Sequence, residues 1–388
     1  MKIILFSHPL FLEHQSMPRY ANWLANGMKA RGHEVSIIYP DAVTYKWKIF
    51  RKFKKWLGYI DQYILFPVNV KSKIKQMPND TLFVFSDHAL GPWVPMVAKR
   101  KHIVHCHDFL AQKSAMGQIP QNPTGTFGKI YQQYIRNGFR QAKNFISISH
   151  KTQTDLHEFL GDDKPNISKV VYNGLNQKFD LQNIDECRQE VGSFINTNLS
   201  SGYFLHVGGN LWYKNRKGVL LIYDAWRKLN PLSQVKLLML GAAPEDDLLS
   251  TYNNCTFKND IHFVLGANDD LLKKAYCGSI MLLFPSIAEG FGWPIAEAMA
   301  SGCPVLTTDA VPMSEVAGTA ALLIEQRPHE DIGLLKWATA AAQKIDVVLS
   351  SKEATDSLIA KGFENVKRFD SDQALDAIED IYIQVYNN

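Results

Sequence analysis

The densest group of side chains that could do chemistry lies between Phe284 and Gly302, where a predicted strand is followed by a loop and a predicted helix. Pro294 suits the first turn of that helix and Gly302 its C-terminal cap. The free N–H groups at the start of a helix can bind an anion such as a diphosphate. Glu289, on the loop, and Glu297, one turn into the helix, could accept hydrogen bonds from sugar hydroxyls. From the residues alone, an equally good interpretation is that one glutamate is a partner of the helix dipole and the other a solvated surface charge.

A second candidate segment covers residues 208–218, which follow a predicted strand and enter a predicted helix. Beside its glycines it carries three cations in four residues, Lys214, Arg216 and Lys217. Arginine binds phosphate through a planar fork and lysine binds it as a point charge. Such cations would stabilise a departing nucleoside diphosphate. The alternative is an exposed basic turn.

A third candidate is His107, which with Asp108 follows the predicted strand His102–Cys106. A histidine at a strand end can bind a hydroxyl of a ligand or polarise a reacting centre. It can also be a capping or packing residue. We interpret His102 and His105 as residues of the sheet.

The elements that must position these residues alternate along the whole chain. Continuous apolar runs separated by helical patterns indicate parallel sheets with helices on both faces. Twelve strands are too many for one sheet, so we predict two six-stranded, doubly wound α/β domains. Ligands of such sheets bind beyond the carboxyl ends of the strands. The predicted strands are Lys2–Ser7, Glu34–Tyr39, Leu82–Ser86, His102–Cys106, Asn144–Ile148, Lys169–Tyr172, Tyr203–Val207, Lys236–Leu240, Ile261–Leu265, Ile280–Phe284, Val305–Thr308 and Ala321–Ile324.

The domain boundary is predicted after Asn173-Gly174, a turn signal at the end of the sixth strand. A length of 388 residues is comfortable for two domains. We predict an N-terminal domain over residues 1–180 and a second domain over 185–370. Residues 371–388 should form a helix that packs back toward the N-terminal domain.

Composition and missing motifs exclude several classes of protein. The five cysteines are odd in number and form no C-x-x-C pair, which argues against a disulfide framework or a cysteine zinc site and favours a reducing, cytoplasmic location. No apolar run approaches the ~20 residues of a membrane span, and the first eight residues read as a strand rather than a signal peptide. No dinucleotide or P-loop glycine motif is present. The only D-x-D, Asp370-Ser371-Asp372, lies away from any strand end, so neither a metal nor a cofactor is expected.

Basic charge is concentrated in one segment. Residues 46–75 hold nine Lys/Arg and one acidic residue, a net charge of +8, whereas the rest of the chain has a net charge of −4. Within this segment Lys46–Ile60 has the apolar spacing of an amphipathic helix, with tryptophans near both ends. Such a helix can lie on the anionic, cytoplasmic face of a membrane. The alternative is a helix that packs on the first sheet with a solvated basic face. No motif supports binding of nucleic acid.

Glu289-x7-Glu297 with the intervening Gly-Phe-Gly resembles the E-x7-E motif of retaining glycosyltransferases of the GT-B fold, particularly family four, the glycosyl transferases of group 1. Further segments resemble the same family in the same order, over roughly residues 1–325. They are Arg31–Val35, Asn173-Gly174, Gly266–Pro285, Gly302–Val305 and Pro312-x2-Glu315-x2-Gly318. The resemblance implies two Rossmann-like domains that face each other across a cleft, the first on the acceptor side and the second binding a sugar nucleotide.

The resemblance also implies roles for individual residues. Glu297 matches the glutamate that binds the ribose hydroxyls, and Glu289 the one that contacts the donor sugar. The amides of Phe291 and Gly292 would then face the donor, and backbone near Gly266 would hold the base.

Two further positions follow the family pattern less closely. His107 matches a His-Asp that family members often carry, and Lys217 matches the lysine of a K-G pair. No arginine directly follows Gly208, where the family usually has one, which leaves Arg216 or Lys214 for that role. The first loop, residues 14–20, lacks the family's Gly-Gly, and its Arg19 could meet an anionic acceptor or be a surface residue.

The function implied is transfer of a hexose from a nucleoside diphosphate sugar to an acceptor hydroxyl, with retained configuration and without a metal. The acceptor would be a sugar or a lipid-linked molecule in cell-surface glycan synthesis. The alternatives are a sugar-nucleotide epimerase or phosphorylase of similar fold, and a non-catalytic protein that binds a sugar nucleotide.

Overall fold

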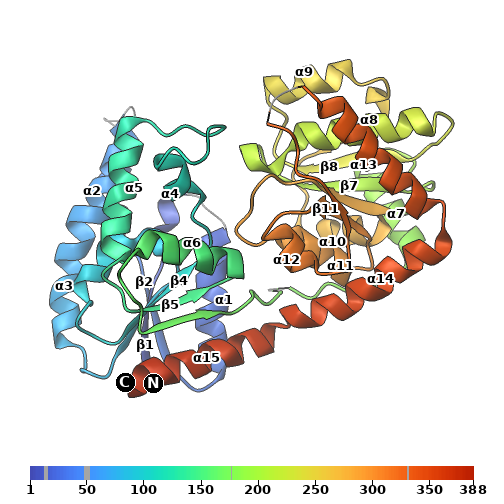
Figure 1. Ribbon diagram of the computed structural model, residues 1–388. Helices are drawn as coiled ribbons and strands as arrows, with labels where there is room; N and C mark the ends of the chain where they lie inside the picture. Colours follow the sequence, from blue (N-terminus) through green and yellow to red (C-terminus); the bar gives the residue numbers. More distant parts are fainter. Residues whose placement is uncertain (13–15, 48–52, 176, 330–331) are drawn as a thin grey trace. The chain divides into compact units, whose positions relative to one another are not determined.

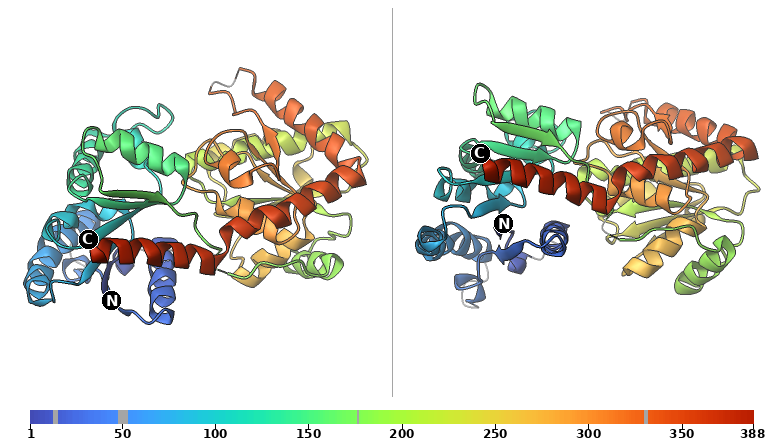
Figure 2. Two further views of the ribbon diagram at one scale, coloured as in Figure 1. Left: turned by 60° about the horizontal axis from the view of Figure 1, so that its bottom comes forward. Right: turned by 90° about the horizontal axis from the view of Figure 1, so that it is seen from below.

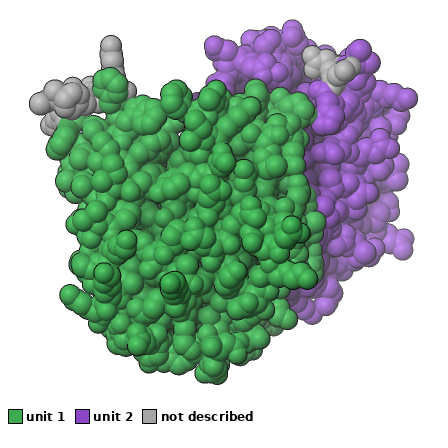
Figure 3. All heavy atoms as spheres, turned by 60° about the vertical axis from the view of Figure 1, so that its left-hand side comes forward, with its two compact units in different colours: residues 1–176, 371–388 green, residues 177–370 purple. Residues whose placement is uncertain are grey.

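The computed structural model describes residues 1–12, 16–47, 53–175, 177–329 and 332–388. The chain divides into two compact units, residues 1–176 with 371–388 and residues 177–370, coloured separately in Figure 3. Each unit contains a six-stranded parallel sheet with helices on both faces (Figure 1). The prediction of two six-stranded α/β sheets is confirmed, and every strand lies within two residues of its predicted position.

The sheet of the first unit has the strand order β2-β1-β3-β4-β5-β6, and all neighbours are parallel. Its central strands are buried on both faces, which explains their continuous apolar sequences. The strands are β1 (Lys2–Phe6), β2 (Glu34–Ile38), β3 (Leu82–Phe85), β4 (His102–Cys106), β5 (Asn144–Ser147) and β6 (Ile167–Val170).

Alternate residues of β1 point to the two helical layers of this unit. Ile3 and Leu5 pack in one apolar core with α1 and α15, whereas Ile4 and Phe6 pack in another with α3, η5 and α5. The helices are α1 (Ser16–Ala30), α2 (Lys54–Ile60), α3 (Phe66–Gln76), α4 (Leu110–Ala115), α5 (Thr126–Phe139), α6 (His150–Leu160) and α15 (Ser371–Asn387). Shorter helical segments are η1 (Leu10–Leu12), η2 (Thr44–Lys46), the π-helix η4 (Asp61–Leu65) and η5 (His88–Met96).

The last helix of the chain, α15, completes the core of the first unit (Figure 2). Leu375 lies so close to Gly27 of α1 that a Cβ atom on the glycine would be 2.4 Å from it. Trp23 of α1 donates a hydrogen bond to Ser371, with 2.8 Å between the nitrogen and the oxygen. The chain therefore returns to its first unit after leaving the second.

The predicted helix over Lys46–Ile60 is wrong at its start. Residues 44–46 form a short turn, Trp47 is extended, and the helix α2 begins only at Lys54; residues 48–52 lie outside the described part of the chain. The cause is Asp61, whose buried carboxylate accepts hydrogen bonds from the N–H groups of residues 43, 44 and 45 at 2.9 to 3.1 Å. This long-range cap holds the turn in place, and the apolar periodicity of the segment does not reveal it.

The sheet of the second unit has the order β12-β11-β10-β7-β8-β9 and is also parallel. Its strands are β7 (Tyr203–Gly208), β8 (Lys236–Gly241), β9 (Ile261–Val264), β10 (Met281–Phe284), β11 (Val305–Thr308) and β12 (Leu322–Ile324). Its helices are α7 (Ile184–Ile195), α8 (Arg216–Leu229), α9 (Asp246–Asn254), α10 (Asp269–Gly278), α11 (Trp293–Ala300), α12 (Met313–Ala317), α13 (Leu334–Leu349) and α14 (Lys352–Val366). Short turns of helix are η6 (Trp212–Lys214), η7 (Lys258–Asp260) and η8 (Lys367–Phe369).

Within the described ranges, no helix is both long and apolar enough to cross a membrane. All five cysteines are buried and free, so none of them forms a disulfide in this structure.

Candidate functional site

The chain reverses its winding direction in the second unit between β7 and β10, which are neighbours in the sheet. From β7 the chain proceeds to β8 and β9 on one side, and β10 leads to β11 and β12 on the other. Ligands of open α/β sheets bind at such a switch point, outside the carboxyl ends of the strands. The loops after β7 and β10 carry the two strongest sequence signals, and the topology places them next to each other.

Hydrogen bonds hold these two loops together. The N–H of Ile287 donates to the carbonyl oxygen of Tyr213 at 2.7 Å, and the side-chain amide of Asn215 donates to the carbonyl of Pro285 at 2.8 Å. Asn215 has a left-handed backbone (φ 50°), which asparagine tolerates, and its side-chain oxygen caps α8 by accepting from the N–H of Gly218. Asn215 therefore caps the start of α8 and sets the direction in which the side chain of the preceding residue, Lys214, leaves the backbone.

That residue, Lys214, forms an ion pair with Glu289 across the switch point. Its Nζ lies 2.8 and 3.0 Å from the two carboxylate oxygens. The lysine side chain is 15% exposed and the glutamate side chain 7%. The Nζ also lies 5.2 Å from the centre of the Phe284 ring. A mostly desolvated cation and a carboxylate thus meet where the sheet topology favours ligand binding.

Arg216, the first residue of α8, is 5% exposed, and two of its guanidinium nitrogens have no hydrogen-bond partner within the described ranges. A third nitrogen donates to the side-chain oxygen of Asn210 in the same loop. Burial lowers the pKa of the Arg216 guanidinium. Buried N–H groups usually have partners, so these unused donors are available to bind an anionic ligand.

Lys217, predicted from its match to the family's K-G pair, makes a different contact. Its amine forms an ion pair with Asp247 in the first turn of α9; the lysine side chain is 34% exposed and the aspartate side chain 77%. The three cations of this segment therefore lie in three different environments. The structure brings Lys214, not Lys217, to Glu289.

The helix α11 begins at Trp293, directly after Gly292, whose φ of 100° is a conformation that glycine adopts without strain. Phe291, the residue before it, is buried against the ring of Phe369, with 5.4 Å between the ring centres. The amides of Phe291 and Gly292 thus precede the positive end of a helix. Gly302, with a φ of 74°, follows the last turn, as its predicted capping position requires.

Glu297 lies on α11, where its carboxylate accepts a hydrogen bond from the hydroxyl of Tyr276 at 2.8 Å. Tyr276 belongs to α10 and is buried, and burial together with the nearby carboxylate raises its pKa well above the usual value. The hydroxyl therefore stays protonated and orients the carboxylate. Sequence reasoning missed Tyr276, because only packing of α10 against α11 brings it to Glu297.

Gly266 follows β9 and has a φ of 71°, and a Cβ built on it would meet no atom within 4 Å. A glycine is thus required at this position by the backbone conformation. It is not required by lack of space for a side chain in this structure. The residue also precedes α10, which starts at Asp269 with Asn268 as its cap. Open backbone at a strand end can approach a flat ligand.

In the first unit, His107 follows β4 and is buried, with its Nε2 2.8 Å from the carbonyl oxygen of Ser86. This bond assigns the proton to Nε2 and leaves Nδ1 as a hydrogen-bond acceptor. Burial lowers the pKa of His107, so the ring is neutral near pH 7. His102 and His105 are buried on β4, as predicted for residues of the sheet.

Asp87, which follows β3, lies between two histidines that sequence reasoning did not single out. Its carboxylate oxygens are 2.8 Å from Nε2 of His8 and 2.9 Å from Nδ1 of His88. Burial opposes ionisation of Asp87, but its contacts with the two histidines outweigh burial and hold its pKa well below the usual range. His8 follows β1, so this cluster marks the switch point of the first sheet. Because ligands bind beyond the carboxyl ends of strands, the positions of His8 and Asp87 just after β1 and β3 could have indicated this cluster from the sequence.

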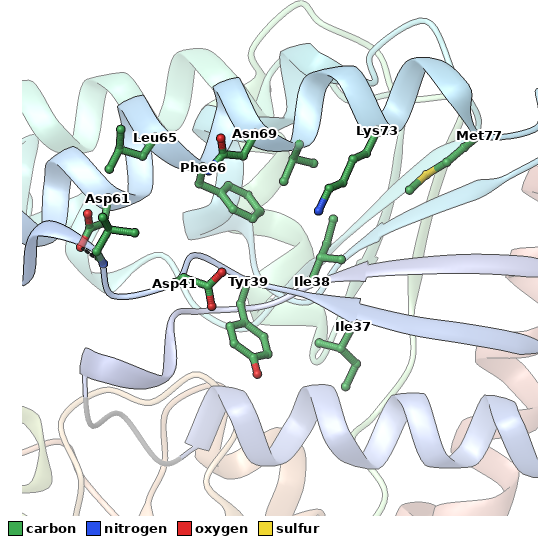
Figure 4. A pocket seen from close by; sticks show the side chains of 12 residues that line it. Ile37, Ile38, Tyr39, Asp41, Asp61, Leu65, Phe66, Asn69, Lys73 and Met77 are labelled. Carbon is green, nitrogen blue, oxygen red and sulfur yellow. Dashed lines mark hydrogen bonds between the residues drawn. The ribbon is translucent and has the colours of Figure 1, made fainter. Parts of the chain in front are cut away.

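The remaining sequence candidates lie elsewhere. Arg19 is exposed on α1, and residues 14 and 15 of the same loop lie outside the described part of the chain. A cavity of about 540 Å³ opens between β2 and α3, with Lys73 and Asp41 among its lining residues (Figure 4). It contains none of the predicted site residues. In the part of the chain that the structure describes, no group of His, Cys, Asp and Glu is arranged to hold a metal ion.

Solved structures define the class of fold. The chain is similar to sucrose-phosphate synthase from Thermosynechococcus elongatus, with a TM-score of 0.73, 15% identity and full coverage of both chains. It is also similar to the Anabaena HepE protein solved in complex with UDP and glucose, with a TM-score of 0.67, 16% identity and 98% coverage of both chains. These likenesses show the GT-B fold, two Rossmann-like domains, as the resemblance predicted.

Family models then identify the group. Residues 202–379 match the glycosyl transferases group 1 and residues 17–179 match glycosyltransferase family 4. The chain belongs to this family of glycosyltransferases. The O-antigen chain mannosyltransferase RfbU of Salmonella typhimurium is 25% identical over 251 residues, which are 63% of this chain and 64% of the relative. The matched region thus spans slightly less than two thirds of the length of the curated relatives.

Proposed function

We propose that the protein is a retaining glycosyltransferase that moves a hexose from a nucleoside diphosphate sugar to an acceptor hydroxyl. The observation that carries this proposal is the group of residues at the switch point of the second unit. There the ion pair of Lys214 and Glu289 lies beside Arg216 with its unused donors, in loops that lead into α8 and α11.

In this proposal the donor's diphosphate is bound by Lys214, Arg216 and the amides of Phe291 and Gly292. A diphosphate would give the buried donors of Arg216 the partners they lack. The diphosphate and Glu289 would both contact Lys214. The positive charge of this lysine would stabilise the leaving group as the glycosidic bond breaks.

The other contacts to the donor are those that the resemblance to the family implies. Glu289 contacts the hexose, and Glu297, oriented by Tyr276, accepts hydrogen bonds from the ribose hydroxyls. Backbone at Gly266 holds the base. His107, neutral and with Nδ1 as an acceptor, binds a hydroxyl of the sugar.

Two named relatives support the choice of substrates. The Anabaena protein was solved with UDP and glucose, and the Salmonella protein is named a mannosyltransferase of O-antigen chains. We propose accordingly a hexose donor, an acceptor that is a sugar or a lipid-linked sugar, and a role in cell-surface glycan synthesis on the cytoplasmic side. The alternative proteins would use the same donor site but differ in their products. An epimerase would release a free or altered sugar and a phosphorylase a sugar phosphate, whereas a non-catalytic binding protein would release no product.

The test has two parts. UDP-, GDP- and ADP-hexoses are screened for a rise in the unfolding temperature, because a ligand at 100 times its dissociation constant adds roughly 2.7 kcal/mol of stability. The best donor is then incubated with sugar and lipid-linked acceptors, and products are identified by mass spectrometry with the anomeric configuration read by NMR. An α-linked donor should give an α-linked product. A β-linked product would contradict retention, and an epimerised donor or a sugar phosphate would contradict transfer.

We predict that chelators leave the activity in place. In this proposal the cations Lys214 and Arg216 neutralise the diphosphate, as a metal would otherwise do. Transfer rates with and without EDTA should agree within about two-fold, well below the 10²-fold scale of losing one electrostatic contact at a reacting centre. Complete loss in EDTA, restored by manganese or magnesium, would overturn this part of the proposal.

A further inference from the structure

Two helices of the first unit that are far apart in sequence expose apolar side chains next to each other. Trp56 of α2 is 50% exposed and Phe127 of α5 is 75% exposed, and their rings meet edge to face with 5.9 Å between centres. Phe53, just before α2, and Ile130 of α5 are exposed as well. We call this the α2–α5 surface: Phe53, Lys54, Lys55, Trp56, Phe127, Lys129 and Ile130.

A layer of tyrosines beneath this surface joins the two helices. The rings of Tyr59 and Tyr131 stack at 5.1 Å, and the hydroxyl oxygens of Tyr63 and Tyr131 are 2.6 Å apart. Tyr63 also packs against Tyr134 of α5. The helices α2 and α5 lie side by side (Figure 1). Because these ring contacts join them, their exposed rings form a single surface.

The charge of the surface is entirely positive. Neither α2, α3 nor α5 contains an aspartate or glutamate. Asp61, which lies between α2 and α3 in the sequence, is buried and bound to backbone N–H groups. Lys54, Lys55 and Lys129 are exposed, and none of the three forms an ion pair with a described residue. Three uncompensated cations thus surround exposed aromatic and aliphatic side chains.

The topology places this surface at one edge of the sheet. The helix α2 follows β2 and α5 follows β4, and each leads back to the start of the next strand. Their first turns, which carry the exposed lysines and aromatic rings, are therefore at the carboxyl edge. His8, Asp87 and His107 lie at the same edge, because they directly follow β1, β3 and β4.

We propose that the α2–α5 surface docks the protein on an anionic lipid bilayer. Tryptophan and phenylalanine at the headgroup level, surrounded by lysines, are the features that favour binding to such an interface. Isolated exposed apolar residues are common, but a contiguous group from two helices, with cations and without anions, is typical of a binding surface. Docking here brings the carboxyl edge of the first sheet toward the bilayer. The inference is independent of the transfer reaction proposed above.

Flotation with vesicles tests the proposal on the full chain. We expect the protein to float with vesicles that contain phosphatidylglycerol and to stay behind with vesicles of phosphatidylcholine alone. Binding should weaken strongly in about 1 M salt, where the Debye length is about 3 Å. A protein that never floats with phosphatidylglycerol vesicles would overturn the proposal.

Charge-reversed variants locate the surface. The combined changes Lys54→Glu, Lys55→Glu and Lys129→Glu should lower the vesicle partition coefficient at least about 100-fold, since each cation near an anionic bilayer contributes favourably. The matched control reverses Lys99, Lys143 and Lys164, which are exposed just before β4, β5 and β6 at the opposite edge of the same sheet. It has the same net charge and should bind as the unaltered protein does. Equal loss in both variants would mean that net charge alone governs binding, and would overturn the assignment.

Phe127→Ser tests the contribution of α5. We expect it to weaken binding at least about five-fold, as loss of a large apolar side chain from the interface implies. An unchanged affinity would exclude the two-helix surface. If single-stranded oligonucleotides bind the protein through these lysines and vesicles do not, the surface is a nucleic-acid site and the proposal is wrong. Circular dichroism and the unfolding temperature verify that each variant is folded.

Discussion

Lys214→Ala is expected to lower the rate of transfer at least about 100-fold, mainly in kcat. The amine of Lys214 is the cation that meets Glu289 at the switch point. Charge on the diphosphate grows as the glycosidic bond breaks, so the loss of a positioned cation should raise the barrier more than it weakens donor binding. Steady-state kinetics with the best donor measure both effects.

Lys217→Ala is the matched control for this prediction. The two lysines lie three residues apart, but Lys217 pairs with Asp247 on the partly exposed side of α8. An exposed ion pair contributes little, so we expect transfer to fall less than about ten-fold. If Lys217→Ala is the damaging change and Lys214→Ala is not, the motif match is right and the geometric assignment is wrong.

A second variant tests whether Lys214→Ala lowers transfer only because it destabilises the protein. Removal of the lysine takes its positive charge away from the buried carboxylate of Glu289, which can destabilise the second unit. The double variant with Glu289→Gln removes that charge as well and should recover stability. Transfer should remain low in the double variant, because the cation is still missing.

Glu297→Ala is also expected to lower turnover at least about 100-fold, through loss of the contacts to the ribose hydroxyls. Donors that lack a ribose hydroxyl provide the decisive comparison. The unaltered protein should use a deoxyribose donor much less well than the ribose donor, whereas the variant should distinguish the two poorly. Such non-additivity is expected only when the residue and the hydroxyl interact.

Two further variants delimit the role of Glu297. Tyr276→Phe removes the hydroxyl that orients the carboxylate and should give a smaller loss in the same direction. Glu364→Ala removes an exposed carboxylate of α14 that pairs with Lys367, and it should leave transfer unchanged. If Glu297→Ala keeps near-normal turnover and the same preference for ribose, the ribose site lies elsewhere.

Most of the architecture could be predicted because it depends on local patterns. Strands such as β3 and β10, which ends at Phe284, are buried on both faces. Their sequences are therefore continuous apolar runs. The errors in the predicted helices and strands lie at their ends. There, hydrogen bonding rather than hydrophobicity determines the first and last residue of the element. The sixth strand, predicted from Lys169, starts at Ile167, because pairing with β5 begins there.

The candidate site could be predicted in part for a related reason. Glu289, Gly292 and Glu297 are recognisable because they belong to one short segment with a strand, a loop and a helix in order. Lys214 and Lys217 could not be ranked from spacing. The left-handed backbone of Asn215 and its cap on Gly218 decide which lysine faces the neighbouring loop.

The sequence by itself determined the two parallel sheets, the order of their strands along the chain and the strand ends at which chemistry is expected. Only the tertiary structure decided which side chains meet there. Lys214 and Glu289 are 75 residues apart, and His8 and Asp87 are 79. Each pair forms because neighbouring parallel strands end at the same edge of a sheet. Which strands are neighbours, and how the loop after each one turns, depends on packing over the whole unit and leaves no local pattern in the residues themselves.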